Sequence, residues 1–220
     1  MYLVTNKHVI YGKNVQNPIG LAPEIDALRL NLHINPKNST ENEEVTISLF
    51  DGTSKLWFEH HDTNVDVVLI PLTIDRTRYV FSTTNKEVID YKDIVVEDFE
   101  RIFVMGYPRG WYDRFNNLPV VRVGHLSSPF KVPFQGMPIM MGDVTTHEGM
   151  SGGPVFMRLT DYVTKGSDGK TTKNLGRTAT RLIGINSGQF VLPGETNMRA
   201  NLIAIWFPEM ILEILRNNGQ

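Results

Sequence analysis

The 220-residue chain contains no cysteine, so disulfides, thiolate metal sites and cysteine nucleophiles are excluded. It also lacks the roughly 18 consecutive apolar residues that a membrane-spanning helix requires, because its longest apolar runs, 67–72 and 202–207, are no longer than single strands. A basic excess is missing too, since 22 Lys and Arg stand against 24 Asp and Glu. We therefore expect neither a membrane span nor binding to the phosphate backbone of a nucleic acid.

Two further features bear on localisation. Residues 1–8 lack the basic stretch and the long apolar run of a secretory signal. The absence of cysteine favours a reducing compartment. Together these features favour a cytoplasmic location without identifying the compartment.

Short apolar or alternating runs recur along the chain and are separated by turn signals such as Asp-Gly, Asn-Asn and Pro-Gly. This pattern predicts an antiparallel, mostly β protein. We expect strands within residues 2–4, 45–50, 65–72, 102–105, 120–123, 154–157 and 181–185.

Three other parts of the chain have a different character. The polar stretches 35–44 and 164–177 are expected to be exposed loops, and residues 82–100 are expected to connect two β units. One helix is predicted at the end of the sequence, because Pro208 precedes an apolar, helix-periodic run with an acid in its first turn and Arg216 near its end.

The sharpest local motif is residues 148–156, Glu-Gly-Met-Ser-Gly-Gly-Pro-Val-Phe, which sets Ser151 among three glycines before a strand-like run. Glycines allow a tight bend that brings backbone N–H groups close to a ligand, as a nucleophile with an oxyanion site requires. The alternative interpretation is an ordinary glycine-rich turn before a strand.

A serine nucleophile needs a histidine base, and every histidine in the chain precedes Ser151. Residues 149–153 fit the Gly-x-Ser-x-Gly elbow of α/β-hydrolases, but there the histidine follows the serine, so that class is excluded. The candidate bases are His8, His33, His60, His61, His125 and His147.

His8 is the best candidate base, because it ends a run with apolar residues on both sides, and a catalytic imidazole is usually held at the end of a rigid strand. Asp66 is the best orienting acid, because it opens the apolar run 66–72. The alternatives are a partly buried histidine near a terminus and an exposed acid at a strand entrance. His8, Asp66 and Ser151 occur in the order that chymotrypsin uses.

A competing cluster is His60, His61 and Asp62. Adjacent histidines on a strand point to opposite faces and cannot both bind one metal without an irregular backbone. We expect this cluster to be a solvated turn, and we predict no metal or other cofactor. A metallohydrolase using these residues stays as a weaker hypothesis.

Three segments together resemble the signature segments of the trypsin-like, chymotrypsin-fold serine peptidases. They are 5–9 (Thr-Asn-Lys-His-Val), 66–69 (Asp-Val-Val-Leu) and 149–154 (Gly-Met-Ser-Gly-Gly-Pro), and they occur in the order of that family. Residues 103–108 and 182–188 and the terminal helix also match. The likeness is greatest to the cysteine-free bacterial branch that includes the HtrA-type proteases.

The resemblance implies an all-β fold of two six-stranded antiparallel barrels followed by a C-terminal α-helix. The N-terminal barrel would span residues 1–90 and carry His8 and Asp66. The C-terminal barrel, with the helix, would span 91–220 and carry Ser151. Members of the family have two or more strands before the histidine, so the first barrel is expected to be truncated.

The resemblance also implies site roles. Ser151 would attack a peptide carbonyl, His8 would transfer the proton and Asp66 would orient the imidazole. The N–H groups of Gly149 and Ser151 would form the oxyanion hole, and Ser187 and Gly188 would bind the substrate backbone. Thr145 falls at the base of the first specificity pocket and, being neutral, predicts small or medium apolar side chains there.

The resulting function is a serine endopeptidase acting on a protein or peptide substrate. The alternative is a catalytically inactive peptide-binding module on the same fold, which a truncated first barrel would favour. The sequence gives no indication of the oligomeric state.

Overall fold

The computed structural model describes residues 1–12, 25–35, 38–85, 89, 93–96, 99–191 and 199–219. Strands make up 51% and helices 10%, which confirms the expected all-β class with a C-terminal helix. The chain divides into two compact units, which are described separately. Unit 1 comprises Met1–Thr83, Gly110–Val120 and Glu209–Gln220, and unit 2 comprises Thr84–Arg109 and Val121–Pro208.

The boundary expected at residue 90 falls outside the described residues. The terminal helix was assigned to the second barrel on sequence, whereas its contacts place it in unit 1.

Unit 2 is built around a closed antiparallel barrel. Its main sheet has the order β13-β14-β11-β10-β9-β12-β8, and β13 pairs with β12 as well as with β14. The strands β9 to β14 thus form a ring in the described part of the chain, with β8 attached to β12. Within the closed part of the ring the strands are paired on both sides, whereas β12 and β13 also extend beyond it. The elements are β8 (Ile94–Val95), β9 (Arg101–Gly106), the 3-10 turn η1 (Pro108–Gly110), β10 (Val120–Leu126), β11 (Ile139–Asp143), β12 (Pro154–Lys165), β13 (Thr171–Val191) and β14 (Arg199–Trp206).

The barrel interior is filled by alternate residues of these strands. In β9, Ile102 and Val104 are fully buried between more exposed neighbours. In β14, Ile203 and Ile205 repeat the pattern, and Met157 of β12 joins the same core. Each such side chain contributes about 1.5–3 kcal/mol through burial.

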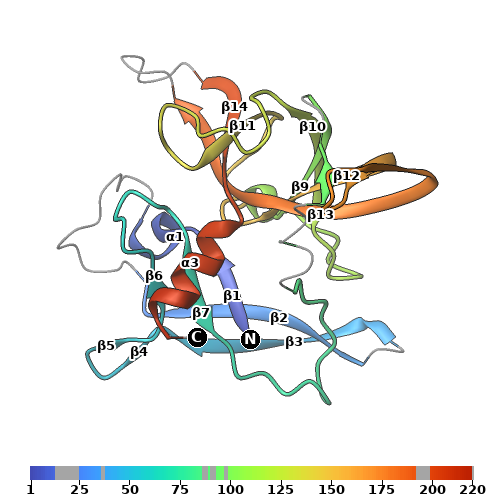
Figure 1. Cartoon of the computed structure of the whole chain (residues 1–220). Coiled ribbons are helices and arrows are strands. Elements are labelled where there is room, and N and C mark those ends of the chain that lie inside the picture. Colours follow the sequence, from blue (N-terminus) through green and yellow to red (C-terminus); the bar gives the residue numbers. More distant parts are fainter. Residues whose placement is uncertain are drawn as a thin grey trace. The chain divides into compact units, whose positions relative to one another are not determined.

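The polar stretch 164–177 was expected to be a loop, but most of it is strand. β12 continues to Lys165, β13 begins at Thr171, and the two form a long ribbon (Figure 1). Such a ribbon satisfies its backbone hydrogen bonds whatever its side chains are, so exposed strands need no apolar alternation.

Unit 1 contains several smaller sheets. Its three-stranded sheet has the order β1-β7-β6, and β2 pairs with β3 and β4 with β5. The described residues of this unit do not join these strands into one closed sheet. The elements are β1 (Tyr2–Thr5), α1 (Lys7–Tyr11), β2 (Ala27–Asn35), β3 (Asn38–Ser48), β4 (Phe50–Asp51), β5 (Ser54–Lys55), β6 (Phe58–Glu59), β7 (Val68–Pro71) and α3 (Glu209–Asn217).

The expected loop at 35–44 is also largely strand, because β2 ends at Asn35 and β3 begins at Asn38. The core of this unit is apolar and aromatic. It consists of Ile10, Tyr11, Leu49, Trp57, Val68 and Ile70.

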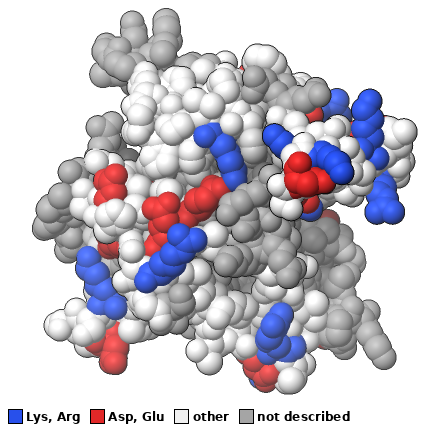
Figure 2. Space-filling model, viewed as in Figure 1, with Lys and Arg blue, Asp and Glu red and all other residues white. Residues whose placement is uncertain are grey.

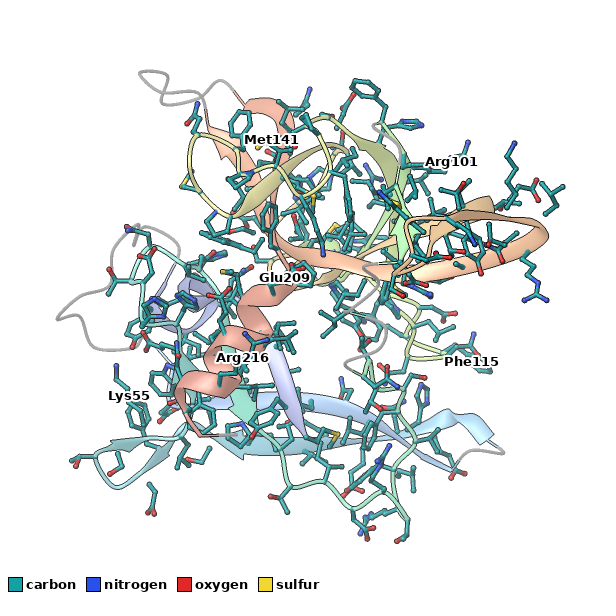
Figure 3. All side chains as sticks on the ribbon, viewed as in Figure 1. Lys55, Arg101, Phe115, Met141, Glu209 and Arg216 are labelled. Carbon is teal, nitrogen blue, oxygen red and sulfur yellow. The ribbon has the colours of Figure 1, made fainter. Side chains whose placement is uncertain are left out.

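The predicted terminal helix is present as α3. It buries Met210, Ile211 and Ile214, and its acidic start and basic end suit the helix dipole. Glu209 and Arg216 mark its two ends in Figure 3.

None of the helices in the described ranges has the length and hydropathy needed to cross a membrane. On the face shown in Figure 2, acidic and basic side chains both occur, and neither covers that face.

Candidate active site

His8 lies in a short helix that follows the expected strand, rather than at the end of the strand itself. Strand β1 ends at Thr5, and α1 begins at Lys7 after the extended residue Asn6. The apolar side chains that suggested a strand instead pack α1 into the core, where Ile10 and Tyr11 are buried. His8 occupies the first turn of this helix.

The structure brings His8 and Asp66 together within unit 1. The ring Nδ1 of His8 lies 2.7 Å from Asp66 Oδ2, and the backbone N–H of His8 donates to Oδ1 at 2.9 Å. An ionised carboxylate can only accept, so Nδ1 carries a proton, and in the neutral ring Nε2 is then the acceptor. These two residues, 58 apart in the sequence, are in direct contact.

Two neighbouring side chains brace the pair and were missed by the sequence analysis. Asn6 Nδ2 donates to the Asp66 carbonyl at 2.7 Å. The buried Lys7 donates to the Thr63 carbonyl at 3.1 Å and forms an ion pair with Glu59 at 3.5 Å. Both tie α1 to the segment that carries Asp66. Their polar character in the run 5–9 is a weak signal, because surface residues share it.

Glu59 is the centre of a charged network beneath α1. Its carboxylate accepts hydrogen bonds from Tyr11 at 2.6 Å and Trp57 at 2.8 Å, and Lys55 lies 3.5 Å away. Burial raises the pKa of Glu59, but these hydrogen bonds and the charges of Lys7 and Lys55 outweigh burial and lower its pKa overall. Burial and the adjacent carboxylate raise the pKa of Tyr11.

Ser151 lies in unit 2, in a turn immediately before β12. Gly149 has a φ of +87°, a conformation that favours glycine. A Cβ at this position would also overlap the Tyr107 carbonyl oxygen. The turn is held from the segment after β9, because Tyr107 N–H donates to the Gly149 carbonyl at 3.1 Å and Arg109 N–H to that of Glu148 at 2.6 Å.

The N–H groups along this turn fall into two sets. Those of Met150, Gly152 and Gly153 donate to backbone carbonyls at 3.2, 2.8 and 3.1 Å. Within the described residues, the N–H groups of Gly149 and Ser151 make no backbone hydrogen bond.

The predicted substrate strand lies beside Ser151. A Cβ on Gly188 would be 3.7 Å from Ser151 Oγ, which places this part of β13 next to the hydroxyl. Gly188 has a φ of +100°, and its N–H donates to Asn186 Oδ1 at 3.1 Å. Ser187, between them, is partly buried. Asn186 was not predicted, and its only signal in the sequence is a polar residue directly after the apolar run 182–185.

Thr145, the predicted specificity residue, is exposed, and its carbonyl accepts a hydrogen bond from Arg122 Nε at 3.0 Å. The adjacent Thr146 is only 1% exposed, and its carbonyl accepts one from Gln189 Nε2 at 2.8 Å. Of the two threonines, Thr146 is the one enclosed beside β13.

The His60–His61–Asp62 cluster is a turn, but the expectation that it is solvated is wrong for His60, which is 7% exposed. Its Nε2 lies 3.0 Å from Glu213 Oε2 of α3, and its ring packs on that of His61 at 4.2 Å. A hydrogen bond from the backbone N–H of Asn64 is the largest factor lowering the pKa of Asp62. The described ranges contain no group of three or more potential metal ligands.

In the comparison with protein families, the model of the trypsin-like peptidase domain matches residues 2–163. The matched region includes His8, Asp66 and Ser151. Comparison with curated proteins gave no match. Because the match covers well over half of the chain, the protein belongs to the trypsin-like peptidase domain family.

Proposed function

We propose that the protein is a serine endopeptidase. Ser151 Oγ attacks a peptide carbonyl while its proton passes to Nε2 of His8. The C–N bond then breaks, and the amine leaves with that proton. In the second half of the reaction, water attacks the acyl-enzyme while its proton passes to His8 Nε2, and His8 returns the proton to Ser151 Oγ as the acid leaves. The observation that carries the proposal is the 2.7 Å contact of His8 Nδ1 with Asp66, which leaves Nε2 as the acceptor.

The nucleophile turn supports the same chemistry. The N–H groups of Gly149 and Ser151 are proposed to bind the oxyanion of the tetrahedral intermediate, and each such donor contributes about 3 kcal/mol to transition-state stabilisation. Their lack of backbone acceptors in the described residues supports this role.

Substrate is proposed to bind as an added strand along Ser187 and Gly188. The N–H of Gly188 is bound to Asn186, so the Gly188 carbonyl is the group proposed to meet the substrate. The preference for small or medium apolar side chains, first assigned to Thr145, stays a proposal, with Thr146 as the better-enclosed candidate. The likeness to the bacterial HtrA-type branch stays a proposal, as does the division into barrels at 1–90 and 91–220, apart from the terminal helix, which belongs to unit 1.

Labelling of the purified protein by a fluorophosphonate tests the function. Wild type is expected to react, and Ser151→Ala and His8→Ala are expected to lose labelling. Ser127→Ala and His125→Ala are matched controls, because both positions are exposed in the same unit as Ser151. A folded wild type that does not react would favour the inactive peptide-binding module.

A further inference from the structure

Asn186 is a fully buried polar residue that follows the apolar residues 182–185 on β13. A buried amide costs free energy unless it is hydrogen-bonded. Its backbone N–H donates to the Gly153 carbonyl at 2.9 Å, and its own carbonyl accepts from Gly152 at 2.8 Å. Its side chain donates to the Met150 carbonyl at 2.7 Å and accepts from Gly188 at 3.1 Å. The residue therefore bonds to both sides of Ser151.

The bond to Met150 fixes the direction of one peptide group. The Met150 carbonyl accepts from both Asn186 Nδ2 and the N–H of Gly153. A trans peptide is planar, and its C=O and N–H point in opposite directions. No cis peptide occurs in the described residues. The Ser151 N–H is thus turned away from Asn186, on the side opposite to the Met150 carbonyl.

The second side-chain bond of Asn186 holds the strand beside the nucleophile. The pairing of β13 with β14 shifts register between Asn186 and Gly188, so ladder bonds alone do not set the backbone there. Asn186 Oδ1 binds the Gly188 N–H at this irregularity. One amide group therefore joins the turn that carries Ser151 to the segment that lies beside its hydroxyl.

We propose that Asn186 is a positioning residue that aims the Ser151 N–H at the developing oxyanion and couples this turn to the substrate strand. This inference rests on the proposed peptidase function. Asn186 touches no reacting atom in this role and acts through Met150 and Gly188. An apolar residue would suit the buried strand equally well, so packing alone does not require the amide.

Two variants test the assignment. Asn186→Ala removes both side-chain bonds, and Asn186→Val does so while keeping an apolar, strand-favouring side chain if alanine prevents folding. Asn174→Ala is the matched control, since Asn174 also bonds neighbouring backbone carbonyls, at 3.3 Å, but in the β12–β13 ribbon. Circular dichroism and the Tm identify the folded variants.

The decisive readout compares a peptide aldehyde, which forms a tetrahedral adduct with a serine, with the corresponding peptide alcohol, which does not. We expect kcat to fall about 10- to 100-fold, below the roughly 10²- to 10³-fold for a donor removed outright. Aldehyde affinity should fall by a similar factor, and alcohol affinity by less than about threefold. Asn174→Ala should match wild type.

Equal losses of affinity for aldehyde and alcohol, or no loss of either, would overturn the role of Asn186. A wild-type protein that neither cleaves peptides nor binds the aldehyde would overturn the proposed function and this assignment with it. A reactive wild type with an unaffected Asn186→Val variant would overturn the assignment alone.

Discussion

Replacing Asp66 by asparagine changes the tautomer of His8 while preserving most contacts. The carboxylate accepts from the His8 backbone N–H at 2.9 Å and from Nδ1 at 2.7 Å. In Asp66→Asn, the amide oxygen can keep the first bond, but its NH₂ group then donates to Nδ1. The ring proton must move to Nε2, which can no longer accept the proton of Ser151. We expect kcat to fall about 10⁴-fold, equivalent to about 5.4 kcal/mol in the activation barrier.

The same change has a small expected effect on stability. A charge-assisted hydrogen bond of about 1.5–3 kcal/mol is replaced by a neutral one of about 0.5–1.5 kcal/mol, so unfolding becomes easier by about 1 kcal/mol. For a chain of this length the Tm should fall by about 2–4 °C. A large loss of rate with a small loss of Tm is therefore the expected signature.

Steady-state cleavage of a fluorogenic peptide and a thermal melt measure both quantities. Asp62→Asn is the control, because Asp62 Oδ1 accepts from the Asn64 N–H at 2.9 Å and an amide oxygen can replace it. The control should keep its rate within about twofold. A folded Asp66→Asn variant with more than a tenth of wild-type kcat would refute the reasoning.

Two further changes test other parts of the molecule. Gly149→Ala should reduce kcat by about 10²-fold or more, because its Cβ would strike the Tyr107 carbonyl oxygen and move an oxyanion donor; peptide cleavage at wild-type rate would contradict this. The lowered pKa of Glu59 means that its contribution to stability is present above its ordinary pKa of 4.5 and is lost as pH falls through the lower folded value. Urea unfolding at pH 6 and pH 3.5 should show a smaller acid-dependent loss in Glu59→Gln than in wild type, and equal losses would argue against the network.

Residue order and type led us to expect His8 and Asp66 in one site, and the structure places the two side chains in contact. Residue order and type did not reveal that α1 interrupts the run 2–10. The helix depends on contacts distant in sequence, such as Asn6 with the Asp66 carbonyl and Lys7 with Thr63. Local helix propensity does not depend on these contacts and so cannot predict them.

The exposed ribbons are strands that the sequence pattern did not reveal. Residues 164–177 look like a loop because water covers both faces, so the apolar alternation by which strands are recognised is missing. The pairing of Val163 with Lys173 and of Thr164 with Thr172 is defined by backbone geometry. Asn186 was also missed, because the role of a buried amide depends on the distant backbone groups to which it bonds, and these cannot be read from the sequence.

The position of α3 in the sequence has a consequence for biosynthesis. Glu213 and Asn217 of this helix bond to His60 and His61, more than 150 residues earlier in the chain. A nascent chain that has emerged through β7 already contains His8 and Asp66, but it lacks the helix that packs against their unit. The whole serine-bearing barrel is synthesised after β7 and before α3. Of the two units, the histidine-bearing one is therefore completed later, and the proposed peptidase would mature only after α3 has been made.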